Sequence, residues 1–232
     1  MIVFAREPVP GTTKTRLIPL LGAAGAARLA DAFIHDAMTK GAALCAGRLV
    51  IAGSARGGAR ASKYFTALAR RFGADLVDQG EGGLGRRMAH VIAAYADPPG
   101  AILFGTDTPS LPPSFIRQCM DDLADAPVVI APAVDGGYYL VGICGPVPDI
   151  FDGIEWGSGK VMAQTLRRLR RLGIPYRLGR WWYDVDRGAD LEFLAADLTR
   201  RLCPASGKSA CPATVRLMRE LGLLKLTFGS GR

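Results

Sequence analysis

The 232-residue chain carries 29 lysines and arginines against 21 aspartates and glutamates, which gives a formal net charge of +8. Apolar residues make up 49% of the chain and charged residues 22%, proportions that are ordinary for a soluble globular protein with a real core. We find no apolar run long enough to span a bilayer and no signal-peptide pattern, so a membrane span is not expected. Charge alone permits a nucleic-acid partner, but no recognition-helix or RNA-binding motif accompanies it, so we do not expect one.

The cysteines and histidines argue against two kinds of site. The five cysteines are scattered, odd in number and without a C-x-x-C pair, which is typical of reduced thiols in a cytoplasmic protein rather than of a disulfide framework. They are Cys45, Cys119, Cys144, Cys203 and Cys211. The two imidazoles, His35 and His90, are not at metal-ligand spacing, so we do not expect a zinc site.

Apolar, strand-like runs alternate with amphipathic, helix-like runs along the chain. We expect strands within residues 2–5, 48–53, 75–79, 100–107, 126–133, 137–143, 174–178 and 181–186. We expect helices within residues 23–40, 62–73, 84–96, 112–125, 159–172, 189–202 and 213–224. This order predicts an α/β layer sandwich with a mainly parallel sheet. Only "VDGG" separates two of the strands, so that pair should be antiparallel and the sheet mixed.

The same pattern predicts the domain organisation. Residues 1–202 should form a single domain. Residues 203–232 should add a Gly/Ser/Pro-rich loop and a last helix packed on that domain, followed by a frayed end.

Polar and charged groups follow four of the expected strands. Ligands of open α/β sheets bind at the carboxyl ends of the strands, so these groups are the candidates for a site. The first group is the stretch "REPVPGTTKTRL", with Gly11, Lys14, Thr15 and Arg16. It lacks P-loop spacing, because Pro8 and Thr13 stand where glycines would be. The others are Asp107, then Asp135 with Gly136 and Gly137, and finally Asp184 with Asp186.

Such a rim suits transfer chemistry on a nucleotide diphosphate or triphosphate. Mg²⁺ or Mn²⁺ takes one or two protein carboxylates and leaves room for water and phosphates. Asp107 and either Asp184 or Asp186 could supply them; we favour Asp186, with Asp184 capping the following helix. Lys14 and Arg16 would neutralise phosphate charge.

Each feature also has a structural alternative. Asp107 could cap a turn, Lys14 and Arg16 could be solvated charges, and the glycine pair could form only a tight turn. The functional alternative for the glycine pair is close approach of a sugar or base to the backbone. One of Tyr138 and Tyr139 should lie in the core, because neighbouring strand residues face opposite sides.

Six motifs together resemble one bacterial family of GT-A-like domains of the glycosyltransferase superfamily. They are "PVPGTTKTRL", "GGLGRRM", "FGTDTPSL", "VDGGYYLVGI", "IEW" and "YDVDRGADL". The family is more distantly similar to the guanylyltransferases that make molybdenum-cofactor dinucleotides and activated phospholactate. The resemblance implies a three-layer α/β/α fold of the nucleotide-diphospho-sugar transferase type with a divalent metal.

The resemblance also implies roles for individual residues. Lys14 and Arg16 match its "KTR" element, Asp107 its metal-binding aspartate, Asp135 its "DGGY" turn and Asp186 its late aspartate. The expected metal ligands are therefore Asp107 and Asp186, and the expected nucleotide-contacting positions are Gly11, Thr15, Gly85, Gly136 and Gly137. The chain departs from the family pattern at Gly83 and Arg86, where acidic residues are common, and at Gly157 and Ser158, where a Ser-Thr pair is usual.

Three functions remain open from the sequence. The leading hypothesis is metal-dependent nucleotidyl transfer from an NTP to an anionic small-molecule acceptor, which needs no general base. The second is glycosyl transfer from a nucleotide-diphospho-sugar donor, for which Asp135 is the candidate base. The third is a nucleotide-binding protein of the same fold without turnover.

Overall fold

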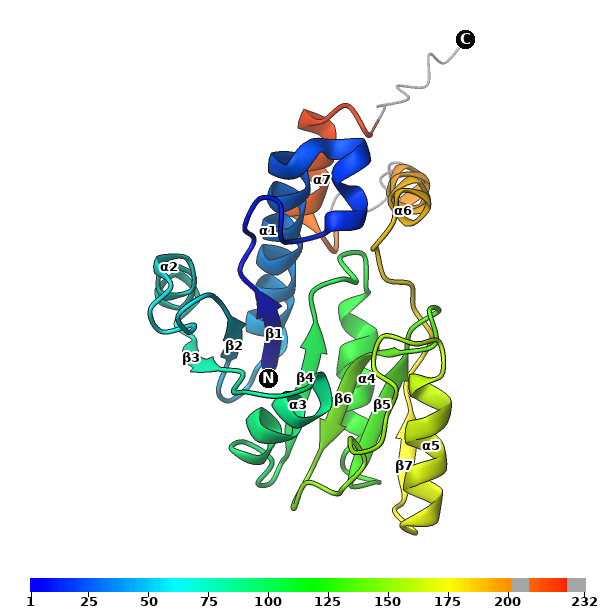
Figure 1. Ribbon diagram of the computed structural model, residues 1–232. Helices are drawn as coiled ribbons and strands as arrows, with labels where there is room; N and C mark the ends of the chain where they lie inside the picture. Colours follow the sequence, from blue (N-terminus) through cyan, green and yellow to red (C-terminus); the bar gives the residue numbers. More distant parts are fainter. Residues whose placement is uncertain (202–208, 225–232) are drawn as a thin grey trace.

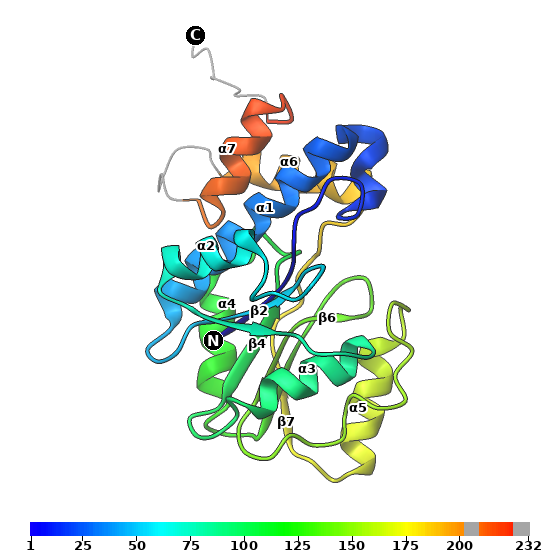
Figure 2. The same ribbon diagram turned by 60° about the vertical axis from the view of Figure 1, so that its left-hand side comes forward.

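The computed structural model of the chain describes residues 1–201 and 209–224. They form a seven-stranded sheet in the order β3-β2-β1-β4-β6-β5-β7, with helices on both faces (Figures 1 and 2). Strand β6 runs antiparallel to its neighbours β4 and β5, whereas the other strand pairs are parallel. The predicted α/β fold with a mixed, mainly parallel sheet is therefore confirmed.

The strands are β1 (Ile2–Arg6), β2 (Val50–Ser54), β3 (Asp75–Asp78), β4 (Ala101–Gly105), β5 (Val128–Pro132), β6 (Tyr138–Ile143) and β7 (Tyr176–Leu178). The helices are a 3-10 turn η1 (Thr15–Leu17), α1 (Ile18–Leu44), α2 (Lys63–Phe72), α3 (Leu84–Ala93), α4 (Pro113–Asp122), α5 (Val161–Arg171), α6 (Gly188–Arg201) and α7 (Pro212–Glu220). Most of the loop expected from Cys203, and the end expected to fray, lie outside the described residues.

Alternate residues of the central strands pack into opposite layers. In β1, Val3 belongs to the apolar cluster beneath α1, α2 and α4, and Ile2 belongs to the cluster beneath α3 and α5. In β4, Phe104 and Leu103 repeat this alternation. Because both faces of the sheet are covered, these strands read as continuous apolar runs in the sequence.

A third apolar cluster lies beyond the carboxyl ends of the strands, where α6 and α7 accompany the N-terminal half of α1 (Figure 2). Phe33 of α1, Leu194 of α6 and Met218 of α7 are fully buried in it. The buried carboxylate of Asp36 accepts hydrogen bonds from the Thr214 backbone N–H and hydroxyl, at 2.8 and 2.6 Å, and so caps α7. These contacts pack α1, α6 and α7 together at the carboxyl ends of the strands.

Helix α1 differs from the sequence-based expectation in two ways. It begins at Ile18, but a kink at Gly22 (φ 68°, ψ 166°) separates its first turn, so the expected start near residue 23 marks the regular helix. By length and composition, Thr15–Leu44 is also apolar enough to cross a membrane, which we did not expect. Half of its most apolar stretch is buried inside the fold. The charged side chains of Asp36 and Lys40, both on α1, are buried as well, so we interpret α1 as a core helix.

The run "WWYDVD" forms no regular strand. It lies beside the end of β5 and makes a single parallel bridge, between Ala133 and Trp182. Gly179 N–H donates to the Ile130 carbonyl, and Trp182 N–H donates to the Pro132 carbonyl. Pro132 has no N–H to donate in return, so the ladder is interrupted at this position. The strand predicted within residues 181–186 is therefore wrong, because the run makes only this one bridge to the end of β5.

Candidate active site

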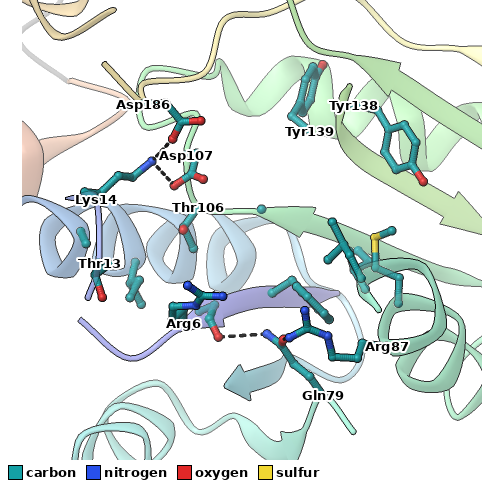
Figure 3. A pocket seen from close by; sticks show the side chains of 18 of the residues that line it. Arg6, Thr13, Lys14, Gln79, Arg87, Thr106, Asp107, Tyr138, Tyr139 and Asp186 are labelled. Carbon is teal, nitrogen blue, oxygen red and sulfur yellow. Dashed lines mark hydrogen bonds and ion pairs between the residues drawn. The ribbon is translucent and has the colours of Figure 1, made fainter. Parts of the chain in front are cut away.

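A cleft of about 540 Å³ opens at the carboxyl ends of the strands. Lys14, Asp107 and Asp186 lie at one end of the cleft, and Gln79 and Arg87 lie at the other (Figure 3). Arg6 and Thr106 lie between these two groups, and Tyr138 and Tyr139 line another side of the cleft. The structure therefore brings together side chains from the first loop of the chain and from the segment before α6.

The loop after β1 is built around Thr13. Its hydroxyl donates to the Glu7 carbonyl at 2.9 Å and accepts from the Val9 N–H at 3.2 Å, which folds the Pro-x-Pro-Gly bend back on itself. Gly11 is exposed, with φ +82°, and does not line the cleft. Lys14 follows in the left-handed region (φ 49°, ψ 44°), and it alone among the described non-glycine residues has a positive φ. This conformation turns its side chain toward the carboxylates.

The ammonium of Lys14 lies between two carboxylates that are far away in the sequence. Its Nζ is 2.6 Å from Asp107 Oδ1, 2.8 Å from Asp186 Oδ1 and 2.7 Å from the Val185 carbonyl oxygen. The Lys14 side chain is 7% exposed, whereas those of Asp107 and Asp186 are 49% and 35% exposed. Arg16 is mostly exposed, and its guanidinium reaches Asp186 only at 4.0 Å.

These contacts set the protonation state of the cluster. Burial acts to lower the pKa of Lys14, but the charges of Asp107 and Asp186 outweigh it and the pKa is raised. Burial acts to raise the pKa of Asp186, but the charge and hydrogen bond of Lys14 hold this pKa below its usual value. Lys14 and Asp186 are therefore both charged at neutral pH.

A second carboxylate pair lies close by. Burial and the neighbouring charge of Asp135 raise the pKa of Asp184 to about 6. Asp135 is exposed, and its Oδ1 accepts the Gly137 N–H at 2.8 Å. The helix cap that we expected from Asp184 is instead made by Asp190, which accepts the N–H groups of Asp186 and Arg187 at 3.0 and 2.7 Å. Asp184 is thus available for another role.

The far end of the cleft is organised by Gln79. Its side-chain amide donates to the carbonyls of Ala5 and Ala52, each at 3.0 Å, and so ties together the ends of β1 and β2. Its Oε1 accepts from Arg87 at 3.2 Å. The Nε of Arg87 is buried and has no hydrogen-bond partner within the described part of the chain. Arg87 thus brings a positive charge to the cleft, and within residues 1–201 and 209–224 it forms no ion pair with a carboxylate.

Three of the expected nucleotide-contacting glycines have close protein neighbours. A Cβ on Gly85 would lie 2.7 Å from the Phe151 carbonyl and 2.7 Å from the Trp156 ring. A Cβ on Gly136 would lie 2.2 Å from the carbonyl oxygen of Gly159. Gly137 lies against the Asp135 carboxylate, and these three glycines are not part of the cleft lining, whereas Thr15 is. The close approach that glycine permits at Gly85 and Gly136 is thus made by the protein itself.

Asp107 and Asp186 are suitable in kind for a divalent cation. Their oxygens are hard ligands and converge on one point, as Mg²⁺ or Mn²⁺ requires. Within residues 1–201 and 209–224, no group of three or more His, Cys, Asp or Glu side chains has metal-binding geometry. Two carboxylates are nevertheless enough for an ion that also binds water and phosphate. The pair fits a divalent ion in chemistry, but the Lys14 ammonium is at the point of convergence.

A part-buried network of hydrogen bonds holds the segment before α6 in place. Tyr183 donates to Asp197 at 2.8 Å and accepts from Ser110 at 2.6 Å, and Arg201 donates to Asp197 at 2.8 Å. Lys40 of α1 is buried and donates to the carbonyl of Pro109, in the loop that carries Asp107. Both aspartate-bearing segments are thus anchored to helices.

Gln79, Arg87 and this network were not predicted from the sequence. Gln79 follows β3 directly, so the rule applied to the other strand ends would have found it. Arg87 lies one helical turn into α3, and the sequence alone does not distinguish it from the neighbouring Arg86. Asp197 lies within a helix whose pattern is simply amphipathic, and no sequence signal distinguishes it.

Comparisons with known proteins support the fold and the family. The profile of a family described as "Uncharacterized protein conserved in bacteria (DUF2064)" matches residues 34–158, more than half of the chain. A crystal structure from Desulfovibrio desulfuricans G20, described as a candidate nucleotide-diphospho-sugar transferase, superposes with a TM-score of 0.78 at 29% identity, over 95% of this chain and 94% of that one. No curated protein matches the chain.

Three more distant structures are also similar to the chain, and of these only the first, with a TM-score of 0.50, bears on the fold. Rv0371c from Mycobacterium tuberculosis H37Rv has a TM-score of 0.50 at 20% identity, over 83% of this chain and 95% of that one. A structure of Rv0371c in complex with manganese has a TM-score of 0.43 at 16% identity, over 83% and 96%. The molybdopterin-guanine dinucleotide biosynthesis protein A from Archaeoglobus fulgidus has a TM-score of 0.49 at 13% identity, over 86% and 100%. The protein has the fold of nucleotide-diphospho-sugar transferases and belongs to the bacterial DUF2064 family.

Proposed function

We propose that this protein transfers a nucleotidyl group from an NTP to an anionic small-molecule acceptor and releases pyrophosphate. The observation that carries the proposal is the convergence of Lys14, Asp107 and Asp186 at one end of a 540 Å³ cleft at the carboxyl ends of the strands. That position is where open α/β sheets bind their ligands. The likeness to a candidate nucleotide-diphospho-sugar transferase over nearly the whole chain supports the same class of donor.

The charge of the cleft suits anionic substrates. Four cationic side chains line it, against the two carboxylates of Asp107 and Asp186. These cations are Arg6, Lys14, Arg16 and Arg87. Arg6 and Arg16 are largely exposed and so remain available to phosphate oxygens. A phosphate or carboxylate acceptor is already nucleophilic, so the protein would mainly position the reactants and neutralise charge.

Asp107 and Asp186 would hold a divalent cation. When bound, such an ion would neutralise the charge of the reacting phosphate group. Arg16 would bind phosphate oxygens near the ion. Gln79 would hold β1 and β2 together beneath the cleft, through its hydrogen bonds to both strands. The departures from the family pattern at Gly83, Arg86, Gly157 and Ser158 all fall outside the cleft lining. Their position favours an active transferase over a protein that only binds nucleotide.

Glycosyl transfer from a nucleotide-diphospho-sugar is the second candidate, and the pair Asp135 and Asp184 favours it. A hydroxyl acceptor needs a general base, and a carboxylate whose pKa is raised to about 6 is suited to that task near neutral pH. The base named from the sequence was Asp135. The structure adds Asp184, whose pKa the charge of Asp135 helps to raise.

A product assay tests these alternatives. The purified protein is incubated with each NTP or nucleotide sugar, a set of phosphorylated and hydroxylated acceptors, and Mg²⁺ or Mn²⁺. Pyrophosphate release supports nucleotidyl transfer, whereas nucleoside diphosphate release supports glycosyl transfer. If the protein binds nucleotide but releases neither product with any acceptor, both transfer reactions are contradicted. That result would support the third hypothesis, a nucleotide-binding protein without turnover.

A further inference from the structure

The Lys14 ammonium is engaged by three oxygens of the protein. Its Nζ donates hydrogen bonds to Asp186 Oδ1 at 2.8 Å and to the Val185 carbonyl at 2.7 Å, and it forms an ion pair with Asp107 Oδ1 at 2.6 Å. The ring of Phe33 packs near the same nitrogen, at 5.6 Å from its centroid. A phosphate in the cleft could therefore not bind the Lys14 ammonium while the ammonium keeps these contacts.

The same three oxygens form a cation site. Carboxylate and carbonyl oxygens are the ligands that hard divalent ions prefer, and here they converge on one point. That point is filled by a cation of the protein's own. Two cations cannot share it, because their mutual repulsion in a half-buried position would oppose the attraction of the carboxylates.

The backbone at Lys14 indicates that this seating is held by its surroundings. A φ of 49° and ψ of 44° place a residue with a Cβ in the left-handed region, which such residues rarely adopt. Conformations of this kind persist when surrounding contacts over-determine them. The contacts of the ammonium with Asp107, Asp186 and Val185 are among those that hold it, together with the hydrogen bond from the Leu17 N–H to the Lys14 carbonyl at 2.8 Å. Release of the ammonium would remove the side-chain contacts from a residue whose backbone is in this unfavourable region.

We propose that Lys14 is an exchangeable internal cation. Its ammonium and a divalent metal ion bind the Asp107–Asp186 pair in a mutually exclusive way, so metal binding expels Lys14 toward the cleft. This exchange does not depend on the reaction catalysed. We further propose that the freed ammonium binds the phosphates of the donor; this second step rests on the proposed function. Lys14 is thereby a positioning residue that keeps the carboxylates charged and converged until metal arrives.

The test measures Mn²⁺ binding to the full-length protein by electron paramagnetic resonance, without nucleotide. Lys14→Met removes the ammonium and keeps a side chain of similar length. Lys63→Met, at the exposed start of α2, removes the same charge away from the cleft. We expect Lys14→Met to bind Mn²⁺ at least tenfold more tightly than wild type, and Lys63→Met to match wild type. Equal or weaker binding by Lys14→Met would overturn the proposal.

A measurement on the unmodified protein covers the case in which Lys14→Met does not fold. Lysine reactivity toward an amine-labelling reagent is followed by mass spectrometry with and without Mg²⁺ at saturating concentration. We expect labelling of Lys14 to rise severalfold with Mg²⁺, while Lys63 stays constant as the internal reference. Unchanged labelling of Lys14 in protein that has bound Mg²⁺ would refute the exchange. Neither readout uses turnover, so failure of the proposed reaction would leave both results intact.

Discussion

The backbone N–H of Val185 donates to the carbonyl oxygen of Asp107 across 2.9 Å, and this bond joins two loops that are far apart in the sequence. Lys14, from a third segment, contacts both loops through its ammonium, which lies close to the Asp107 carboxylate and the Val185 carbonyl. The junction is therefore held by main-chain as well as side-chain contacts. A substitution that removes only a side-chain charge should change the electrostatics of the site and leave the backbone in place.

Asp107→Asn is such a substitution. The amide keeps the shape of the carboxylate but loses the charge that would hold a divalent ion. Since loss of one preorganised electrostatic contact commonly costs about 10²–10³ in rate, we expect at least a 100-fold loss of metal-dependent product release. Circular dichroism should show the wild-type fold. Asp125→Asn, on an exposed aspartate 3.7 Å from Arg177, is the control and should keep full activity. Near-wild-type turnover by Asp107→Asn would remove this residue from the mechanism.

The fold was predictable because its signals are local. Val3 and Phe104 lie in continuous apolar runs that report burial on both faces, and Pro112 and Pro113 mark the start of a helix. The wrong strand prediction, for residues 181–186, depended on a neighbouring strand. The run "WWYDVD" has the composition of a strand, but Pro132 of the adjacent β5 has no N–H to donate and interrupts the ladder.

The site was predictable at its strand ends and not beyond them. The rule that ligands bind at carboxyl ends pointed to Lys14, Asp107 and Asp186, and the structure brings these three side chains together. The rule does not say that the lysine would occupy the point where a metal was expected. That depends on a left-handed backbone at a non-glycine residue, for which the sequence has no signal. Gln79 could have been found, since it ends β3.

Gln79→Leu should destabilise the protein, because it leaves the Ala5 and Ala52 carbonyls without their buried donor. An unsatisfied buried polar group costs about 1–3 kcal/mol, so we expect the free energy of unfolding to fall by about 2–4 kcal/mol in urea titrations. Gln118→Leu is the matched control, since Gln118 is exposed and its amide donates only to the Asp122 carboxylate on its own helix. It should change the free energy by less than about 0.5 kcal/mol. Equal effects of the two changes would contradict the role assigned to Gln79.

Asp197 should make stability depend on pH in the acid range. Burial acts to raise its pKa, but the hydrogen bonds from Arg201 and Tyr183 outweigh burial and hold the pKa below the usual value of 3.8. The ionised carboxylate therefore stabilises the fold above pH 3.8, and this contribution is lost as the pH falls through the folded-state pKa. We expect Asp197→Asn to lower the melting temperature clearly at pH 7, and the gap from wild type to narrow at pH 3.

The control for this prediction is Asp75→Asn, which removes an exposed ion pair with Arg48. Exposed pairs contribute about 0–1 kcal/mol, so this variant should melt close to wild type at both pH values. A gap between Asp197→Asn and wild type that is as wide at pH 3 as at pH 7 would show that the loss is one of packing rather than of charge.

Gly136→Ala should be more damaging than an ordinary glycine substitution, and the chain offers a control that separates the two reasons. Gly136 has φ +90° and Gly145 has φ +92°, so alanine meets a similar backbone penalty of about 1–2 kcal/mol at each position. At Gly145 a Cβ meets nothing within 4 Å, whereas at Gly136 it would lie 2.2 Å from the Gly159 carbonyl oxygen. That clash is with backbone, and relieving it requires the Asp135 turn or the start of α5 to move. We therefore expect Gly136→Ala to lose at least about 2 kcal/mol more than Gly145→Ala in urea unfolding, and to lose the proposed transferase activity, which Gly145→Ala should retain. If the two variants were equally stable and equally active, the contact between Gly136 and Gly159 would have no part in shaping the site.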